Sequence, residues 1–421
     1  MVCANVGQSE MEGVLMSNGS QHSANAGNRR SNNLPTVGAL LVTGIIIGQV
    51  VELSPSLNQW ATSRIWLVPQ LLWGGLFGLI GRELVAVRKT SGRNATLAYS
   101  FLYAVIPVLI VIGLTRIVIG PLASSDGPSD YFRDIRSWSY LTNVIGLPQV
   151  DLPGVFEFSF VSDVVNATVW AIPCFYLLVI AALVGGGDRL KTRIVVGAIG
   201  LAIIAAEIFG WFGAFWPDRL SINPAATLVA GLMGMTFYHI MVPRRAILSL
   251  CLCICLGVVG LMIRAQWPSE LLIAQEMLAA TIGGALAILA ASRGGRPKAF
   301  AQFLLPVLSP ALLASFPLQQ LLATNRSVEN GFVFSLLAAI LPIAIVSLSI
   351  TYVISLAARR LGYVHQDPTR ASFRMPDRHK ARHLLRTLRW DLAGLIALLV
   401  CVLLFALAMA LFALSRPVLA N

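Results

Sequence analysis

The sequence predicts an all-α protein, a polytopic bundle of membrane-spanning helices, and two observations support this fold class. First, 57% of the 421 residues are hydrophobic and only 12% are charged, with a mean hydropathy of +0.76. A soluble domain carries about twice that share of charged residues. Second, the apolar residues form long runs, and a helix that spans a bilayer needs about 17–25 of them in succession. We therefore expect lipid to surround most of the chain.

Eleven apolar runs are predicted to cross the bilayer as helices, because a helix makes all its backbone hydrogen bonds internally. The second run is the shortest, and Pro306, Pro310 and Pro317 predict a break in the ninth. The eleven runs cover residues 34–51, 65–80, 97–114, 164–184, 194–215, 222–242, 246–263, 271–291, 303–323, 332–356 and 392–414.

The positive charges predict the orientation. If the N-terminus is cytoplasmic, most of the 31 Lys and Arg residues fall in the loops on the cytoplasmic side, as the positive-inside rule requires. The C-terminus is then extracytoplasmic. Residues 1–33 are rich in Ser, Asn and Gly and lack the apolar core of a signal peptide, so we expect a disordered cytoplasmic tail.

The domain organisation follows from these runs. We expect a ten-helix membrane core at residues 34–357 with a long outer loop at 115–163. A basic cytoplasmic loop at 358–391 leads to the eleventh helix and a short outer tail at 392–421. The basic loop could dock on anionic headgroups or an acidic partner, or it could be only the signal that fixes the last helix.

Composition excludes several other classes. The net charge of +12 is explained by orientation in a membrane, and we expect no nucleic-acid partner. Five of the six cysteines lie inside apolar runs, so a disulfide framework is not expected. Cys251, Cys253 and Cys255 do not all share one helix face and have no neighbouring histidine or carboxylate, so no metal site is expected.

Polar and ionisable residues inside the apolar runs are the candidates for function, because such residues are costly in lipid. Glu207 could be a general acid or base, a proton relay, or a structural carboxyl bonded to a neighbouring helix. His239 could be catalytic or merely solvated near the interface. The remaining candidates are Gln49, Gln70, Gln275, Glu276, Gln319 and Gln320. The glycine pairs Gly74-Gly75 and Gly283-Gly284 are better explained by close helix packing.

Several short motifs occur in a fixed order along the chain. The outer loop contains Leu152-Pro-Gly-Val-Phe156, followed by Val165-Asn-Ala-Thr-Val-Trp170. Leu228-Val-Ala-Gly-Leu-Met-Gly234, Val242-Pro243 and Phe316-Pro-Leu-Gln-Gln320 come later. Together with the segment Val37–Val42, these motifs make residues 34–362 resemble the acyltransferase-3 family, the bacterial membrane proteins that O-acylate surface glycans.

The resemblance implies a fold and an activity. It implies a ten-helix core in the bacterial cytoplasmic membrane, and transfer of an acyl group, expected to be acetyl, from acyl-coenzyme A to a hydroxyl of a surface or lipid-linked polysaccharide. Asn166, Trp170, Gln319 and Gln320 would bind the acceptor. The basic segment 82–93 would meet the coenzyme phosphates, or it would only carry positive-inside charge.

The chain departs from the family pattern where the chemistry resides. The family's first-helix arginine and histidine fall near Pro35 and Ile46, its Arg-x-x-Arg falls near residues 99–102, and its glutamate falls near Phe175. Acyl transfer needs a base and oxyanion donors. Either His239 or Glu207 has taken over as base, or the chain is an inactive relative that binds or helps to export polysaccharide. A small-molecule transporter is the third hypothesis.

Overall fold

The described part of the chain is helical in the computed structural model. It comprises residues 33–53, 67–125, 127–145, 152, 154–155, 166, 168–186, 188–208, 222–239, 268–292, 299–324 and 332–360. Side chains at some helix ends lie outside this description, as do the seventh and eleventh expected helices, the N-terminal tail and the basic loop. Four stretches of the described residues, within 34–52, 68–123, 273–292 and 340–358, are long and apolar enough to cross a bilayer. The protein is thus a helical membrane protein.

The second and third expected helices are joined by helical structure, so the segment between them is helical where the sequence suggests a loop. Helix α2 covers Leu34–Glu52, and α4 covers Val68–Ser100. The path then continues through η1 (Phe101–Val105), α5 (Ile106–Leu114), η2 (Thr115–Ile119) and α6 (Gly120–Ala123). The chain turns within α4 at Gly92, whose φ of 86° is a left-handed conformation that favours glycine.

Nine further elements complete the described chain. Three short ones, α7 (Pro128–Arg133), α8 (Ile135–Ser139) and η3 (Tyr140–Ile145), lie in the expected outer loop. The expected start of this loop at residue 115 is wrong, because the helical path continues through Ala123. The longer helices that follow coincide with the fourth, fifth, sixth, eighth, ninth and tenth expected helices. They are α9 (Ala171–Gly185), α10 (Arg189–Ile208), α12 (Pro224–His239), α14 (Pro268–Ser292), α15 (Ala299–Thr324) and α16 (Phe332–Arg360).

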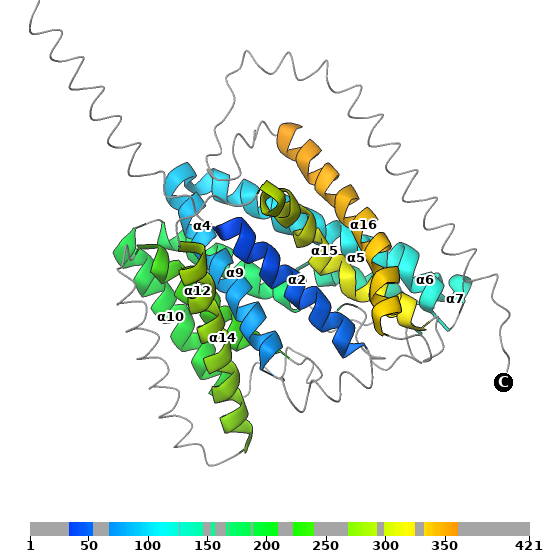
Figure 1. The fold of residues 1–421 in the computed structure, drawn as a ribbon, viewed down its shortest axis with the longest axis horizontal. Coiled ribbons are helices and arrows are strands. Elements are labelled where there is room, and N and C mark those ends of the chain that lie inside the picture. The colour runs from blue at the N-terminus through cyan, green and yellow to red at the C-terminus, as the bar shows by residue number, and fades with distance from the viewer. Residues whose placement is uncertain are drawn as a thin grey trace, which may run out of the picture.

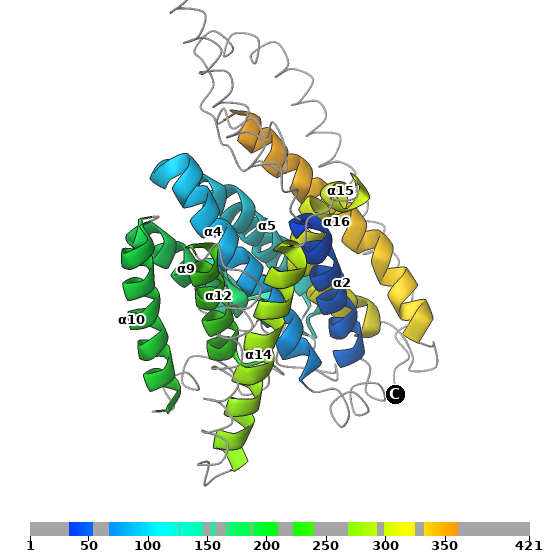
Figure 2. The ribbon, with the colours of Figure 1, turned by 60° about the vertical axis from the view of Figure 1, so that its left-hand side comes forward.

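The helices form two groups on either side of α2 and α4 (Figure 1). Helices α9, α10, α12 and α14 lie on one side, and α5, α15 and α16 lie on the other. In the turned view, α9 and α10 again lie to the left of α4, and α15 and α16 lie to its right (Figure 2). Helix α4 packs against both α12 and α14, while α15 packs against α2 and α16. Helix α4 thus joins members of the first group, and α2, which packs against α4, α14 and α15, connects the two groups.

Glycine allows α4, α12 and α14 to touch through their backbones. A Cβ added to Gly78 would lie 2.9 Å from the Cα of Gly284, and one added to Gly81 would overlap the carbonyl of Gly231. Real Cβ atoms essentially never approach so closely. The prediction that the glycine pairs Gly74-Gly75 and Gly283-Gly284 serve helix packing is confirmed, since all four lie where α4 meets α14.

Proline does not break α15. The helix runs without interruption from Ala299 to Thr324, although Pro306, Pro310 and Pro317 lie within it. The expected break is therefore wrong. The helix stays continuous at Pro317 because a side chain from another segment replaces the hydrogen bond that proline cannot make, as described below.

The two ends of the bundle differ in chemistry. We call one end the amide end, because Gln49, Gln70, Asn166 and Gln319 lie there. We call the other the cationic end, where α4 carries Arg82, Arg88 and Lys89 and α10 begins at Arg189. Helices α2 and α15 run toward the amide end, as the contact between Ser315 and Gln49 shows, whereas α4, α9 and α12 start there.

The short helix α8 in the outer loop is capped by an acidic residue. Asp134 accepts a hydrogen bond from the backbone N–H of Arg136 at 2.8 Å and from its Nε and Nη2 at 3.0 and 2.8 Å. The hydrogen bonds from the Arg136 side chain, followed by that from its backbone, lower the pKa of the Asp134 carboxyl. The carboxylate therefore stabilises the folded loop most when it is ionised.

This cap predicts a pH dependence with a definite sign. Because the folded-state pKa of Asp134 is depressed, its contribution is present above the unfolded value of about 3.9 and disappears as the pH falls through the folded value. We expect Asp134→Asn to speed hydrogen exchange at the Arg136 amide at neutral pH, with the difference from wild type vanishing in acid. Asp130→Asn, which removes only a 3.9 Å surface pair, should leave that amide unchanged.

Candidate functional site

A set of buried polar side chains lies between α2, α15 and the start of α9, near the amide end. We call it the amide seam and define it as Gln49, Asn166, Trp170, Ser315 and Gln319. Each has at most 8% of its surface exposed. Because polar groups are costly inside a membrane protein, a buried cluster of this kind is the first place to look for a function.

Asn166 binds α15 at the point where proline leaves a carbonyl free. An α-helical carbonyl accepts from the N–H four residues later, and for Leu313 that residue is Pro317, which has no N–H. The Nδ2 of Asn166 donates to the carbonyl oxygen of Leu313 at 3.1 Å instead. Its Oδ1 accepts from the N–H and the hydroxyl of Thr168 at 3.1 and 2.6 Å. Asn166 therefore keeps α15 continuous and ties it to the segment before α9.

Ser315 connects α15 to α2 in the same seam. Its hydroxyl donates to the Oε1 of Gln49 and also lies 3.1 Å from the carbonyl oxygen of Leu312. Leu312, Ser315 and Gln319 follow at helical spacing and so share one face of α15. Leu312 packs in the same hydrophobic cluster as Trp170, so this face of α15 is directed toward α2 and α9.

Two members of the seam have unmet hydrogen-bonding capacity. Both Nε2 and Oε1 of Gln319 are buried and find no partner among the described residues, and neither does the indole Nε1 of Trp170. A glutamine amide has two donor hydrogens and two acceptor lone pairs. Burying such a group without partners costs about 1–3 kcal/mol, so these atoms are the best evidence for a ligand that the seam would receive.

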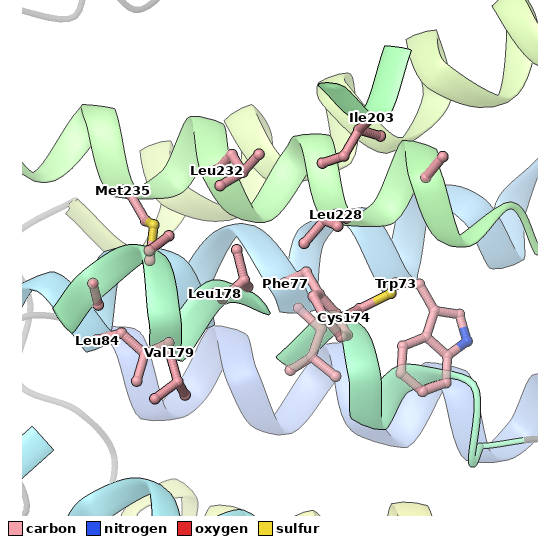
Figure 3. Close-up of a cluster of buried hydrophobic side chains, with 14 of the residues drawn as sticks. Trp73, Phe77, Leu84, Cys174, Leu178, Val179, Ile203, Leu228, Leu232 and Met235 are labelled. Carbon is pink, nitrogen blue, oxygen red and sulfur yellow. The ribbon is translucent and has the colours of Figure 1, made fainter. Parts of the chain in front are cut away.

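Aromatic rings form the wall of the seam beneath Trp170. The Trp170 ring lies edge-on to Trp73, with centroids 4.8 Å apart, and stacks with Phe77 at 6.2 Å. Figure 3 shows Trp73, Phe77 and Cys174 beside one another. The same hydrophobic cluster continues to Leu84 on α4 and Met235 on α12. Trp170 is only 1% exposed, so its ring is fixed by packing while its N–H has no partner.

The other glutamines of the candidate set have different environments. Gln70 is fully used in structure: its Nε2 donates to the carbonyl of Asn223 and to Thr227, and its Oε1 accepts from the N–H of Asn223 at 2.7 Å. Gln70 thereby holds the start of α12 against α4. Gln320 is fully buried, and Gln275 and Glu276 are half-buried on α14.

The two candidate bases belong to opposite ends of the bundle. Glu207 is the next-to-last residue of α10, which begins at the cationic end, so its backbone lies at the amide end. His239 is the last residue of α12, about 22 Å along the helix from Pro224. Pro224 lies at the level of Cys174, near Trp170. Both side chains lie outside the described residues. The backbone therefore separates His239 from the amide seam.

The cationic end brings several basic groups together on α4. The ammonium of Lys89 lies 5.6 Å from the centroid of the Tyr238 ring. The Nη1 of Arg82 and the Nε of Arg88 are buried without a hydrogen-bond partner among the described residues. The segment 82–93, expected to be a loop, is helical except at Gly92. This end could hold a phosphate-bearing ligand, since guanidinium groups bind phosphate well.

Sequence reasoning missed two members of the seam's environment, Ser315 and Trp73. Neither residue type is unusual in a membrane helix, so no local pattern distinguished them. A signal did exist for Asn166, because a proline inside a helix always leaves the carbonyl four residues earlier in need of a donor. Among the described residues, no group of three or more His, Cys, Asp or Glu side chains could hold a metal ion.

The comparisons with known proteins identify no relative: no family model, no curated protein and no solved structure matches this chain.

Proposed function

We propose that the chain is an acyltransferase-3-like membrane protein that binds a hydroxyl-rich acceptor, a surface or lipid-linked glycan, in the amide seam. The observation that supports this function is the buried amide of Gln319, which has no partner among the described residues. Amide and indole groups on an aromatic wall suit a neutral ligand with many hydroxyls, because an amide can both donate and accept hydrogen bonds and the indole N–H can donate one.

The proposed reaction transfers an acyl group, expected to be acetyl, from acyl-coenzyme A. The acceptor hydroxyl oxygen attacks the thioester carbonyl, a base takes the hydroxyl proton, and the coenzyme leaves as its thiolate. Arg82, Arg88 and Lys89 at the cationic end would hold the coenzyme phosphates. His239 follows Tyr238 at that end, so we assign it to the coenzyme. Glu207 belongs to the amide end, so we assign it to the acceptor. We propose that the protein lies in a bacterial cytoplasmic membrane. The charge bias favours a cytoplasmic position for the cationic end.

A second candidate function is favoured by the chemistry of the seam itself. The seam's described side chains are amides, a hydroxyl and an indole, which bind ligands but do not exchange protons near neutral pH. An inactive relative that binds glycan or assists its export would need these groups and no base. The acyl content of the glycan at normal glycan yield distinguishes the two functions.

Replacement of Gln319 tests the seam. We expect Gln319→Leu to lower acyl transfer from labelled acetyl-coenzyme A to membrane glycan about tenfold, the cost of one or two lost hydrogen bonds of about 1 kcal/mol each. The same change should leave thermal stability unchanged or raised, because it removes a buried amide that lacks a partner.

Gln275→Leu is the matched control, since it removes a half-buried amide on α14 outside the seam. We expect it to keep wild-type transfer. If the two variants lose activity equally, or if Gln319→Leu is strongly destabilised, Gln319 is a structural residue and the seam is not the acceptor site. If wild-type membranes transfer no acyl group but Gln319→Leu reduces the amount of surface glycan, the second function is correct.

A further inference from the structure

A buried arginine lies outside the amide seam, at the point where the long helical stretch from α4 ends. Arg116 belongs to the π-helical turn η2 and is only 4% exposed. Its Nε donates to the carbonyl oxygen of Ser137 at 2.7 Å, and its carbonyl accepts from the hydroxyl of Tyr131 at 2.8 Å. Its Nη2 is buried and has no hydrogen-bond partner among the described residues. Hydrogen bonds thus hold both the backbone and the side chain of Arg116 in place, while its Nη2 group is unused.

The charge of Arg116 is not neutralised by the described carboxylates of the outer loop. Asp130 pairs with Arg133, and Asp134 pairs with Arg136 at 2.8 Å. The guanidinium instead lies 3.5 Å from the centroid of the Trp138 ring and 5.7 Å from that of Phe132. Aromatic faces attract a cation but accept no strong hydrogen bond from it, so the site still favours an anion.

Large apolar side chains are exposed on the short elements that pack against this arginine. Ile135 is 78% exposed and Trp138 57%, and Phe132 and Leu141 are each 40% exposed. They belong to α7, α8 and η3, which follow directly after the apolar stretch that ends at Ala123. Short helices with exposed aromatic and aliphatic residues at the end of a membrane span are typical of the lipid–water interface.

We propose that Arg116 and the exposed apolar residues of this loop form a binding site for an anionic phospholipid in the leaflet at the amide end. The Nη2 and neighbouring guanidinium hydrogens would donate to the headgroup phosphate, and Ile135, Trp138 and Leu141 would enter the acyl-chain region. The half-exposed Trp138 ring covers the guanidinium and must swing aside to admit the phosphate. The combination of a buried cation with a surrounding apolar surface matches a ligand that carries both a phosphate and hydrocarbon.

Lipid retention on the purified full-length protein tests this site. The protein is exchanged into nanodiscs of phosphatidylcholine with one fifth phosphatidylglycerol, extracted into mild detergent, and the bound lipids are counted by native mass spectrometry. We expect wild type to retain phosphatidylglycerol in preference to phosphatidylcholine, and Arg116→Met to retain several-fold less phosphatidylglycerol. Arg133→Met removes an exposed arginine of the same loop, with 84% of its side chain exposed, and should retain the wild-type amount.

A second measurement needs no change at Arg116. In the wild-type protein, brominated phosphatidylglycerol should quench tryptophan fluorescence more than brominated phosphatidylcholine, and Trp138→Phe should remove the difference. Glycerol phosphate in solution should not compete, because it lacks hydrocarbon; if it does compete, the site binds free phosphate esters. Equal quenching by the two lipids, or equal phosphatidylglycerol retention by the Arg116 and Arg133 variants, overturns the proposal.

Discussion

Replacing Gly81 with alanine is expected to be among the most damaging single-methyl changes in the described membrane core. The added Cβ would overlap the carbonyl of Gly231 and come within 3.3 Å of the Cγ of Met235. Both obstacles lie on α12, and one of them is backbone, so neither a rotamer change nor a flexible side chain can relieve the overlap. Overpacking of a well-packed core costs about 1–3 kcal/mol, and we expect the upper end of this range or more.

Helix α4 cannot move away from α12 to relieve the strain, because its opposite contacts are equally close. A Cβ on Gly78 would lie 2.9 Å from the Cα of Gly284, and one on Gly74 would overlap the backbone of Ala280, and both of these neighbours lie on α14. A displacement of α4 would therefore open the contacts that hold all three helices together. Size-exclusion chromatography and thermal unfolding in detergent should show a large loss of folded protein for Gly81→Ala.

Gly197 provides the matched control for this experiment. It is also a glycine in a membrane-core helix, but a Cβ at Gly197 would find nothing within 4 Å. Alanine is preferred to glycine inside a helix by about 1 kcal/mol, so Gly197→Ala should be neutral or slightly stabilising. If the two alanine variants unfold at the same temperature, the close backbone contact between α4 and α12 is absent from the native protein.

Composition and periodicity predict the helices of this protein well, because a membrane helix needs only a run of apolar residues. They predict poorly where one helix ends. The segment around Arg82, Arg88 and Lys89 looks like a loop by charge, yet α4 continues through it and turns only at Gly92. A charged residue near the end of a membrane helix can extend beyond the apolar layer, so charge alone does not end a helix.

The candidate site is less predictable, because its members come from distant parts of the chain. Gln49 and Gln70 are equally polar residues in apolar runs, yet Gln49 belongs to the seam and Gln70 clamps α12. Only the neighbours decide between these roles. The sequence indicates Gln319 because a glutamine is rare in lipid, and the structure adds the observation that its amide finds no partner among the described residues. Chain proximity does not supply that information.

Asn166 and Pro317 should be energetically coupled, which a double-mutant cycle can measure. Asn166→Ala leaves the buried carbonyl of Leu313 without a donor and should cost about 1–3 kcal/mol. Pro317→Ala restores an N–H four residues after Leu313, so that α15 can satisfy this carbonyl itself. In the Pro317→Ala background, Asn166→Ala should therefore cost about 1 kcal/mol less.

The residual cost in that background has its own source. Asn166 also accepts from the N–H and hydroxyl of Thr168, and these contacts are lost whichever residue occupies position 317. Thr168→Val removes only the hydroxyl donor, and its cost should be independent of Pro317. Additive costs for Asn166→Ala and Pro317→Ala would mean that the carbonyl of Leu313 has another donor. A non-zero coupling energy between Asn166 and Pro317 would show that a residue of the candidate acceptor site also supplies the hydrogen bond that proline removes from α15. Substitutions at Asn166 would then lower stability and function together, unlike those at Gln319.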